Sequence, residues 1–178
     1  YTGICGSDNS ATLGKPNFDW VERPRIIGHE FSAEILELGP GDHGDLKVGD
    51  RFTPLAMLGC QDEACPACSV AKWNLCPQKQ IIGFHRNGGF GQQVVLESDR
   101  VVPLMYGLTP EQGALVEPLS VVVNALHNTC NIKPGDDVVI PTYTFTATGE
   151  VVTYLGARPV LADCRADTLN VDLDTIEP

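Results

Sequence analysis

The chain has 178 residues, with 12 Lys and Arg against 23 Asp and Glu, so its formal net charge is −11 at pH 7. This negative balance argues against a nucleic-acid partner, because no basic stripe is present to neutralise phosphates. Hydrophobic residues make up 43% of the sequence, which predicts a packed globular chain, and no apolar run is long enough to predict a membrane span.

The beginning of the sequence and its cysteines suggest the context of the chain. The chain begins at Tyr1 without an initiator Met, so we expect it to be part of a longer protein. No secretory leader is visible, and cysteines clustered in a chain without a leader are typical of metal binding. A cytoplasmic location is therefore predicted.

Short apolar runs separated by turn sequences fill the first hundred residues. The runs predict strands at residues 26–27, 31–38, 48–54, 91–96 and 100–104. The intervening Gly-Pro-Gly at 39–41 and Asn-Gly-Gly at 87–89 are typical turn sequences. This spacing of short strands predicts a mainly β fold, either a small antiparallel barrel or a sandwich.

Four of the seven cysteines lie within one short segment, at positions 60, 65, 68 and 76. Four thiolates on a short loop can surround one Zn²⁺ tetrahedrally and leave no position open, so the spacing predicts a structural zinc site. An iron–sulfur cluster and a redox pair of Cys65 and Cys68 stay open as alternatives. A disulfide-bonded secreted domain is a further alternative.

A second candidate metal set consists of Cys5, His29 and Glu30. One thiolate, one imidazole and one carboxylate can hold Zn²⁺ and leave a position for a substrate oxygen. Glu117, in a later helix, could supply or replace the carboxylate. The simpler alternative is that His29 is an ordinary structural histidine.

The pattern changes to helical after residue 108. Thr109 followed by Pro110 predicts a helix start, because threonine caps a helix and proline fits its first turn. The helix is predicted to continue over residues 114–127, with a kink at Pro118.

The last part of the sequence predicts a β-α-β unit. Residues 138–140 are typical of a buried parallel strand, residues 145–155 of a helix ended by Gly156, and residues 158–162 of a second strand. The predicted fold is therefore mainly β with an α/β tail.

Residues 1–140 resemble the zinc-dependent medium-chain alcohol and polyol dehydrogenases, especially the sorbitol, butanediol and threonine dehydrogenase branch. The resemblance rests on GICGSD, GHE, KVGDR, the four-cysteine segment ending in NLC, GGF and ALVEPLS, in that order. It implies a GroES-like barrel catalytic domain, expected over residues 1–130 and truncated at its N-terminus. The first gap of the cysteine segment has four residues, where the family usually has two.

The resemblance also implies roles for the site residues. The implied ligands of a catalytic zinc are Cys5, His29 and Glu30, with Glu117 beside the metal or its water, and those of a structural zinc are Cys60, Cys65, Cys68 and Cys76. The implied catalytic residues are Ser7, Asp8, His29 and Glu30. Among these, Ser7 would relay the alcohol proton and Asp8 would orient His29, although Ser7 and Asp8 also fit as plain turn and cap residues.

The implied reaction is the oxidation of a secondary hydroxyl of a small alcohol or polyol to a ketone. The hydride would pass to NAD or NADP, and the parent enzyme would be a homo-oligomer. Residues 39–44 match the GxGxxG pattern of a dinucleotide-binding turn, but no helix fits between Gly44 and the next turn. After residues 138–140, where the family has its glycine-rich turn, the sequence reads PTYTFTATGE. We therefore expect the cofactor domain to be absent and the chain to be inactive alone.

Residues 135–172 instead resemble the DegT-type sugar aminotransferases, which use pyridoxal phosphate (PLP). No Lys follows Lys133, so this segment lacks the lysine that PLP chemistry requires. We expect residues 131–178 to be an aminotransferase-like β-α-β fragment, joined to the dehydrogenase portion near residue 140. A divergent dehydrogenase is the alternative to a join, and a non-catalytic zinc-stabilised module is the alternative to an enzyme.

Overall fold

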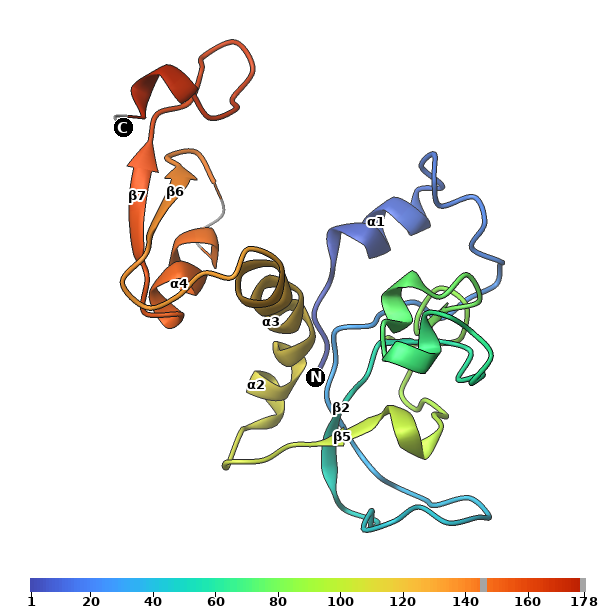
Figure 1. The fold of residues 1–178 in the computed structure, drawn as a ribbon. Coiled ribbons are helices and arrows are strands. Elements are labelled where there is room, and N and C mark those ends of the chain that lie inside the picture. Colours follow the sequence, from blue (N-terminus) through green and yellow to red (C-terminus); the bar gives the residue numbers. More distant parts are fainter. Residues whose placement is uncertain (145–146, 177–178) are drawn as a thin grey trace. The chain divides into compact units, whose positions relative to one another are not determined.

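The computed structural model describes residues 1–144 and 147–176. The chain divides into two compact units, Tyr1–Pro118 and Leu119–Pro178, whose elements are drawn in Figure 1. No helix of the described residues is long and apolar enough to cross a membrane.

The first unit contains two small antiparallel sheets. Strands β1 (Ala33–Glu34), β2 (Arg51–Pro54) and β5 (Val101–Pro103) form one sheet, in the order β1-β2-β5, and β3 (Met57–Leu58) pairs with β4 (Gln80–Ile81) in the other. The strands predicted at 48–54 and 100–104 are present in shortened form. The strand pairing among the described residues does not close these sheets into a barrel.

Three of the strand predictions need correction. The strand predicted at 31–38 is reduced to β1, and residues 26–27 and 91–96 form no strand. Residues 26–27 bond instead to a loop, since the amides of Gly88 and Phe90 donate to the carbonyls of Ile26 and Ile27 at 2.7 and 3.0 Å. Within 91–96, Val94 and Leu96 pack against the core but form no strand ladder. The apolar pattern of this segment therefore indicates packing against the core and not a strand.

Two buried clusters stabilise the first unit. The larger one contains Phe31, Ile35, Phe52 and Ile82. In the smaller one, Ala11 of helix α1 (Gly6–Thr12) packs with Val21 and Phe84. These contacts hold α1 against the segments that precede and follow the four-cysteine loop.

The predicted helix start at Thr109 is present. Helix α2 (Pro110–Ala114) has Thr109 as its N-cap, whose side chain accepts a hydrogen bond from the Gln112 amide, while the Gln112 side chain accepts one from the Thr109 amide. The long helix then breaks at Leu115, before α3 (Val116–Val123) begins. Pro118 accounts for this break, because a proline lacks the amide for the carbonyl four residues earlier and its ring crowds that turn. A π-helical segment, Asn124–Thr129, follows α3.

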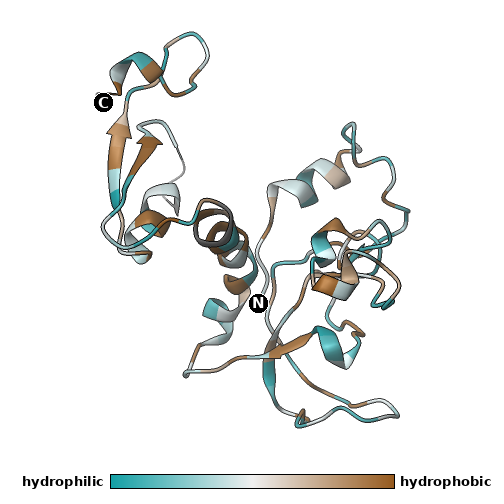
Figure 2. Cartoon of the chain, viewed as in Figure 1, coloured by the Kyte–Doolittle hydropathy of each residue, from teal (hydrophilic) through white to brown (hydrophobic). Residues whose placement is uncertain are grey.

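The second unit contains strand β6 (Asp137–Pro141), helix α4 (Ala147–Tyr154) and strand β7 (Arg158–Ala162). β6 and β7 are parallel, with Val139 opposite Val160, and both strands are coloured largely hydrophobic in Figure 2. Ile140, Val152 and Ala157 form the buried core of this unit. Residues 145–146 of the predicted helix 145–155 lie outside the described residues.

Short 3-10 turns complete the described structure. They lie at Cys68–Val70, Trp73–Leu75, Ser98–Arg100 and Leu173–Thr175. The first two shape the loop that carries the four cysteines.

Candidate metal centres

The fold gathers the four cysteines of the loop into one cluster. The sulfur atoms of Cys60, Cys65, Cys68 and Cys76 all lie within 4.8 Å of one another. The Cys60 and Cys68 sulfurs are 3.7 Å apart and those of Cys65 and Cys76 are 3.9 Å apart. Four sulfurs at about 2.3 Å from a tetrahedral Zn²⁺ would be about 3.8 Å apart, so the cluster has the dimensions of a closed zinc site.

The loop backbone prepares one of these thiols for metal binding. Cys76 is buried, and its sulfur accepts hydrogen bonds from the amides of Cys60 and Gln78, each at 3.4 Å. These donors lower the pKa of Cys76 to about 7. The Asp62 amide lowers the pKa of Cys60, but burial and the neighbouring thiols outweigh it and raise that pKa to about 12. A cation at the centre of the four sulfurs would favour their thiolate forms and so oppose the raised pKa of Cys60.

The longer first gap of the loop is absorbed by local turns. Gln61 adopts a left-handed backbone with φ of 60°, and the Asp62 side chain accepts a hydrogen bond from the Ala64 amide at 2.8 Å. The Cys65 amide then donates to the Asp62 carbonyl at 3.0 Å. The two extra residues therefore form a tight turn that returns Cys65 to the cluster.

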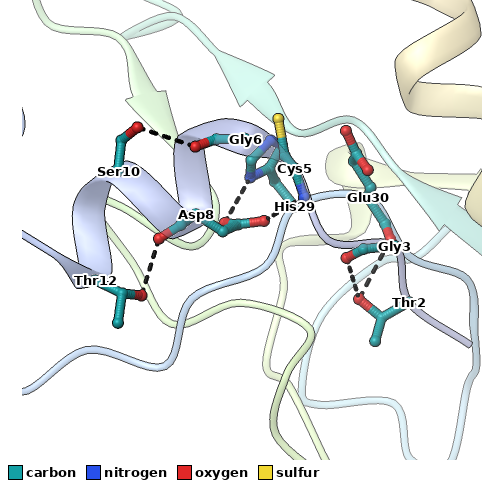
Figure 3. A network of polar contacts seen from close by, with 9 residues as sticks. All are labelled: Thr2, Gly3, Cys5, Gly6, Asp8, Ser10, Thr12, His29 and Glu30. Atoms are coloured by element: carbon teal, nitrogen blue, oxygen red, sulfur yellow. Dashed lines mark hydrogen bonds and ion pairs between the residues drawn. The ribbon is translucent and has the colours of Figure 1, made fainter.

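The second predicted metal set is also brought together. The ligand atoms of Cys5, His29 and Glu30 lie within 4.8 Å of one another, and Figure 3 shows these side chains close together beside α1. Cys5 is the N-cap of α1. Backbone pairing brings it to its partners, because the Gly3 amide donates to the Glu30 carbonyl at 2.7 Å and Thr2 pairs with Phe31.

Asp8 lies behind the imidazole of His29. Its carboxylate is buried, with Oδ1 3.4 Å from His29 Nδ1 and Oδ2 accepting from the Cys5 amide at 3.0 Å. A proton on Nδ1 would face this carboxylate, which leaves Nε2 with a free lone pair for a metal. Asp8 thus contacts two of the three candidate ligands.

Glycines allow the backbone to approach closely where it positions His29. Gly28 has φ of +98°, and a Cβ there would lie 2.4 Å from the Phe90 ring. A Cβ on Gly88 would lie 2.1 Å from the Gly28 carbonyl oxygen. The segment before His29 is therefore fixed by backbone packing that only glycine permits.

Glu117 is half-buried in α3 and interacts electrostatically with the same site. Burial is the main cause that raises its pKa, the charges of Glu30 and Asp8 raise it further, and His29 lowers it. A cation near these carboxylates would favour the ionised form of Glu117. Ser7 lies in the first turn of α1, half-buried and directly before Asp8.

Sequence reasoning missed the aromatic wall of this site. The Phe84 ring lies 5.2 Å from the His29 ring, and Phe18 and Trp20 contact Phe84 edge-on. The only hint in the sequence was the apolar run that precedes Gly83, and it did not distinguish a site residue from a core residue.

Two families match different parts of the chain. The alcohol dehydrogenase GroES-like domain matches residues 1–106. The DegT/DnrJ/EryC1/StrS aminotransferase family matches residues 120–178.

Individual relatives are longer dehydrogenases. The chain is 34% identical over 138 residues to L-galactonate-5-dehydrogenase of Escherichia coli, a match that covers 78% of this chain and 38% of the relative. It is 36% identical over 140 residues to sorbitol dehydrogenase of Bacillus subtilis, covering 78% of this chain and 38% of that enzyme. The chain thus spans less than half the length of these curated relatives.

The fold is similar to that of solved dehydrogenase structures. One of them is a zinc-binding dehydrogenase from Sinorhizobium meliloti bound to NADP. It aligns with a TM-score of 0.77 and 26% identity, over 96% of this chain and 50% of that chain.

Proposed function

The chain belongs to the alcohol dehydrogenase GroES-like domain family, and we propose that it is the catalytic portion of a zinc-dependent NAD(P) dehydrogenase. The proposed reaction is the oxidation of a secondary hydroxyl of a small alcohol or polyol to a ketone. Relatives named for sorbitol and L-galactonate support a polyol as the substrate class.

One observation carries the proposal, namely the open ligand set of Cys5, His29 and Glu30 beside the buried Asp8. Three protein ligands of mixed type are typical of a catalytic zinc, whereas the four-cysteine cluster is typical of a structural one. When bound at the open set, zinc supplies Lewis-acid activation of the substrate hydroxyl.

The remaining site residues would handle the proton and the orientation of the ligands. Asp8 would hold His29 through Nδ1 and present Nε2 to the metal. Ser7, one residue before Asp8, is proposed to accept the substrate proton and pass it on. Glu117 is proposed to lie beside the metal or to replace Glu30 as its carboxylate ligand.

The described turn after β6 does not fit a nicotinamide dinucleotide. β6 ends at Pro141 and leads into Thr-Tyr-Thr rather than a glycine-rich turn, so the close approach of backbone to a pyrophosphate is not available there. We propose that the chain alone does not turn over substrate and that the cofactor half belongs to a longer parent protein. A homo-oligomeric parent and a cytoplasmic location are part of the same proposal.

We propose that residues 1–130 form the GroES-like catalytic domain and residues 131–178 an aminotransferase-like β-α-β fragment. The two family matches support two parts of different origin without fixing the boundary between them. A match to the DegT family over residues 120–178 supports a chimeric origin for this fragment. PLP does not fit the fragment, because no Lys follows Lys133.

A second candidate function is a non-catalytic module stabilised by zinc. The closed geometry of the four-cysteine cluster favours it, because such a site needs no open position. In this case the Cys5 set would hold no exchangeable metal.

Counting and replacing the metal separates the two candidates. We expect two zinc ions per chain, one of which exchanges for Co²⁺, and a change in the cobalt absorption when sorbitol is added. His29→Gln should retain one zinc, whereas Cys130→Ser, which alters an exposed cysteine outside both clusters, should retain two. A single tightly held zinc in the unmodified chain would contradict the dehydrogenase proposal and support the module.

A further inference from the structure

A basic cavity opens on the first unit, outside both metal clusters. It has a volume of about 420 Å³ and is lined by Arg25, His85, Arg86, Asn87 and Gln93 together with Ile26, Val94 and Val95. Two guanidinium groups, an imidazole and two amides line it, and no carboxylate does. In a chain with a net charge of −11, this concentration of positive charge and hydrogen-bond donors needs an explanation.

Arg25 has donor capacity that its protein partners do not use. Its side chain is largely buried, and one of its terminal nitrogens lies 3.4 Å from Glu22, whose side chain is 88% exposed. Arg25 Nε is buried and has no hydrogen-bond partner among the residues that the structure describes. An arginine has five N–H donors in a planar fork, so the single contact with Glu22 leaves donors on its terminal nitrogens for a ligand, whereas the buried Nε is not exposed to one.

Arg86 is the second arginine that lines the cavity. It forms an ion pair with Glu97, which also contacts the buried Arg100. Glu97 is therefore shared between two arginines, and Asp99 also acts on the charge of Arg100. Glu97 contacts one terminal nitrogen of Arg86, and an arginine carries five N–H donors, so Arg86 retains donors for a ligand.

His85 and Asn87 hold the rim in place. The His85 ring stacks on Trp20 with centroids 4.7 Å apart, and its Nδ1 accepts a hydrogen bond from the Ile81 amide at 3.1 Å. The proton of the neutral ring is thus on Nε2, which makes that nitrogen a donor. The side-chain carbonyl of Asn87 accepts from the Ile26 amide at 3.2 Å, which leaves the Asn87 amide group as a donor.

The cavity adjoins the segments that carry the metal ligands. Ile26 lies three residues before His29 on the same backbone segment. Phe84 directly precedes His85 in the sequence, and its ring lies 5.2 Å from the His29 ring. A small ligand in the cavity would therefore contact the two segments that also surround His29.

We propose that this cavity is an oxyanion site in which Arg25 and Arg86 bind the phosphate or carboxylate end of a small ligand. Planar guanidinium groups match both oxyanions in a bidentate manner. The assignment of that ligand as the substrate rests on the proposed dehydrogenase function, but the binding of an oxyanion does not.

The test is a titration of the isotope-labelled, zinc-loaded full chain at constant ionic strength, followed by NMR. The probes are methyl phosphate and acetate, added separately. We expect saturable shifts of the Arg25 and Arg86 Nε–H signals and of the Asn87 amide group. Tighter binding of methyl phosphate would identify phosphorylated ligands, and equal or tighter binding of acetate would identify carboxylates. Linear shifts spread over the surface cations with both probes would overturn the proposal.

Three variants sharpen the test. Arg25→Gln should weaken binding about tenfold, whereas Arg51→Gln, which removes the same charge from an exposed residue outside the cavity, should change it less than twofold. Glu22→Gln should tighten binding two- to threefold, because it removes the one carboxylate paired with Arg25. Equal effects of Arg25→Gln and Arg51→Gln would refute the site. The readout needs no turnover, so it is independent of whether the dehydrogenase proposal stands.

Discussion

Asp8 and His29 form a buried pair in which one carboxylate faces one imidazole nitrogen at 3.4 Å. Neither Asp8 Oδ1 nor His29 Nδ1 has another hydrogen-bond partner within the described part of the chain. The tautomer of His29, and with it the nitrogen offered to a metal, therefore depends on Asp8.

Asp8→Asn should weaken zinc binding at the Cys5 set by about 10- to 100-fold, because the neutral amide no longer orients the imidazole by charge. The four-cysteine cluster should keep its zinc. Competition with a fluorescent chelator measures both affinities. Ser10→Ala serves as the control, since the Ser10 hydroxyl donates a hydrogen bond to the Gly6 carbonyl within α1 and Ser10 belongs to neither cluster. Unchanged affinity in Asp8→Asn would mean that Asp8 is merely a helix cap.

Glu97 is a second residue whose charge matters, because it contacts both Arg86 and the buried Arg100. Burial raises the pKa of Glu97, but the hydrogen bond and charge of Arg86 outweigh this and hold it below its ordinary value of 4.5. A carboxyl whose pKa is lowered by folding stabilises the fold above its unfolded-state pKa. That contribution is lost as the pH falls through the folded-state pKa.

Glu97→Gln should therefore lower the free energy of unfolding by about 0.5–1 kcal/mol near pH 7, since the buried Arg100 loses one charged partner while solvent screens the half-exposed Glu97. The difference from the unmodified chain should shrink as the pH falls below about 4.5. Urea unfolding at a series of pH values measures this difference, with the exposed Glu63→Gln as the control. A difference that stays constant with pH would show that the carboxylate charge is not involved.

The four-cysteine cluster could be predicted from its spacing, whereas the roles of Cys5, His29 and Glu30 were implied by the resemblance to the zinc-dependent dehydrogenases. The side chains that surround these clusters could not be predicted from the sequence. Phe84 reaches His29 and Glu97 reaches Arg86 through folding of the chain between distant segments, and no local pattern encodes such contacts. The cavity that Arg25 and Arg86 both line was missed for the same reason.

At the level of elements, the loop around residues 83–90 acts as a scaffold for the segment that carries His29. Gly88→Ala should disrupt it, because the new Cβ would lie 2.1 Å from the Gly28 carbonyl oxygen and 2.8 Å from the Gly83 Cα. We expect a loss of about 1–3 kcal/mol in stability and loss of the exchangeable metal, with the four-cysteine zinc retained. Metal analysis and thermal unfolding measure the two effects.

Gly39→Ala is the matched control for this variant, because a Cβ there meets no atom within 4 Å. It should leave both metals and the stability unchanged. Retention of the exchangeable metal in Gly88→Ala would show that the loop can shift without moving His29.

Elements with strong end signals were predicted best. Thr109, Pro110 and Gly156 mark helix ends through capping and backbone preferences that act locally. Helix α1 was missed because its GSDNSAT sequence is poor in strong helix formers. Strands β3 and β4 have two residues each, too few for an alternating pattern to be visible.

For the molecule as a whole, the two units differ in how much core they bury. The second unit rests on a two-stranded sheet and helix α4, and its buried apolar residues in the described part of the chain are Ile140, Val151, Val152, Ala157 and Ala162. A two-stranded sheet is marginally stable by itself. No sequence pattern marks the boundary between the units, because Pro118 and Leu119 both lie inside α3.

Hydrogen exchange should therefore show at least tenfold faster exchange for the β6 and β7 amides than for those of β2. Val152→Ala, which removes methyl groups from the buried centre of the second unit, should lower the protection of β6 by about 1–3 kcal/mol and leave β2 unchanged. Equal protection throughout, falling together in the variant, would show that both units unfold as one.

The chain order of the two metal sites has a consequence for biosynthesis. The ligands of the open site lie among the first thirty residues, but the glycine loop that fixes His29 follows only after the cysteines at 60–76. The ribosome makes the chain from its N-terminus. The four-cysteine cluster is therefore complete before synthesis reaches the loop at residues 83–90 that positions His29. A nascent chain would thus acquire its permanent metal first, and the early ligands would stay unassembled until residue 90 has emerged.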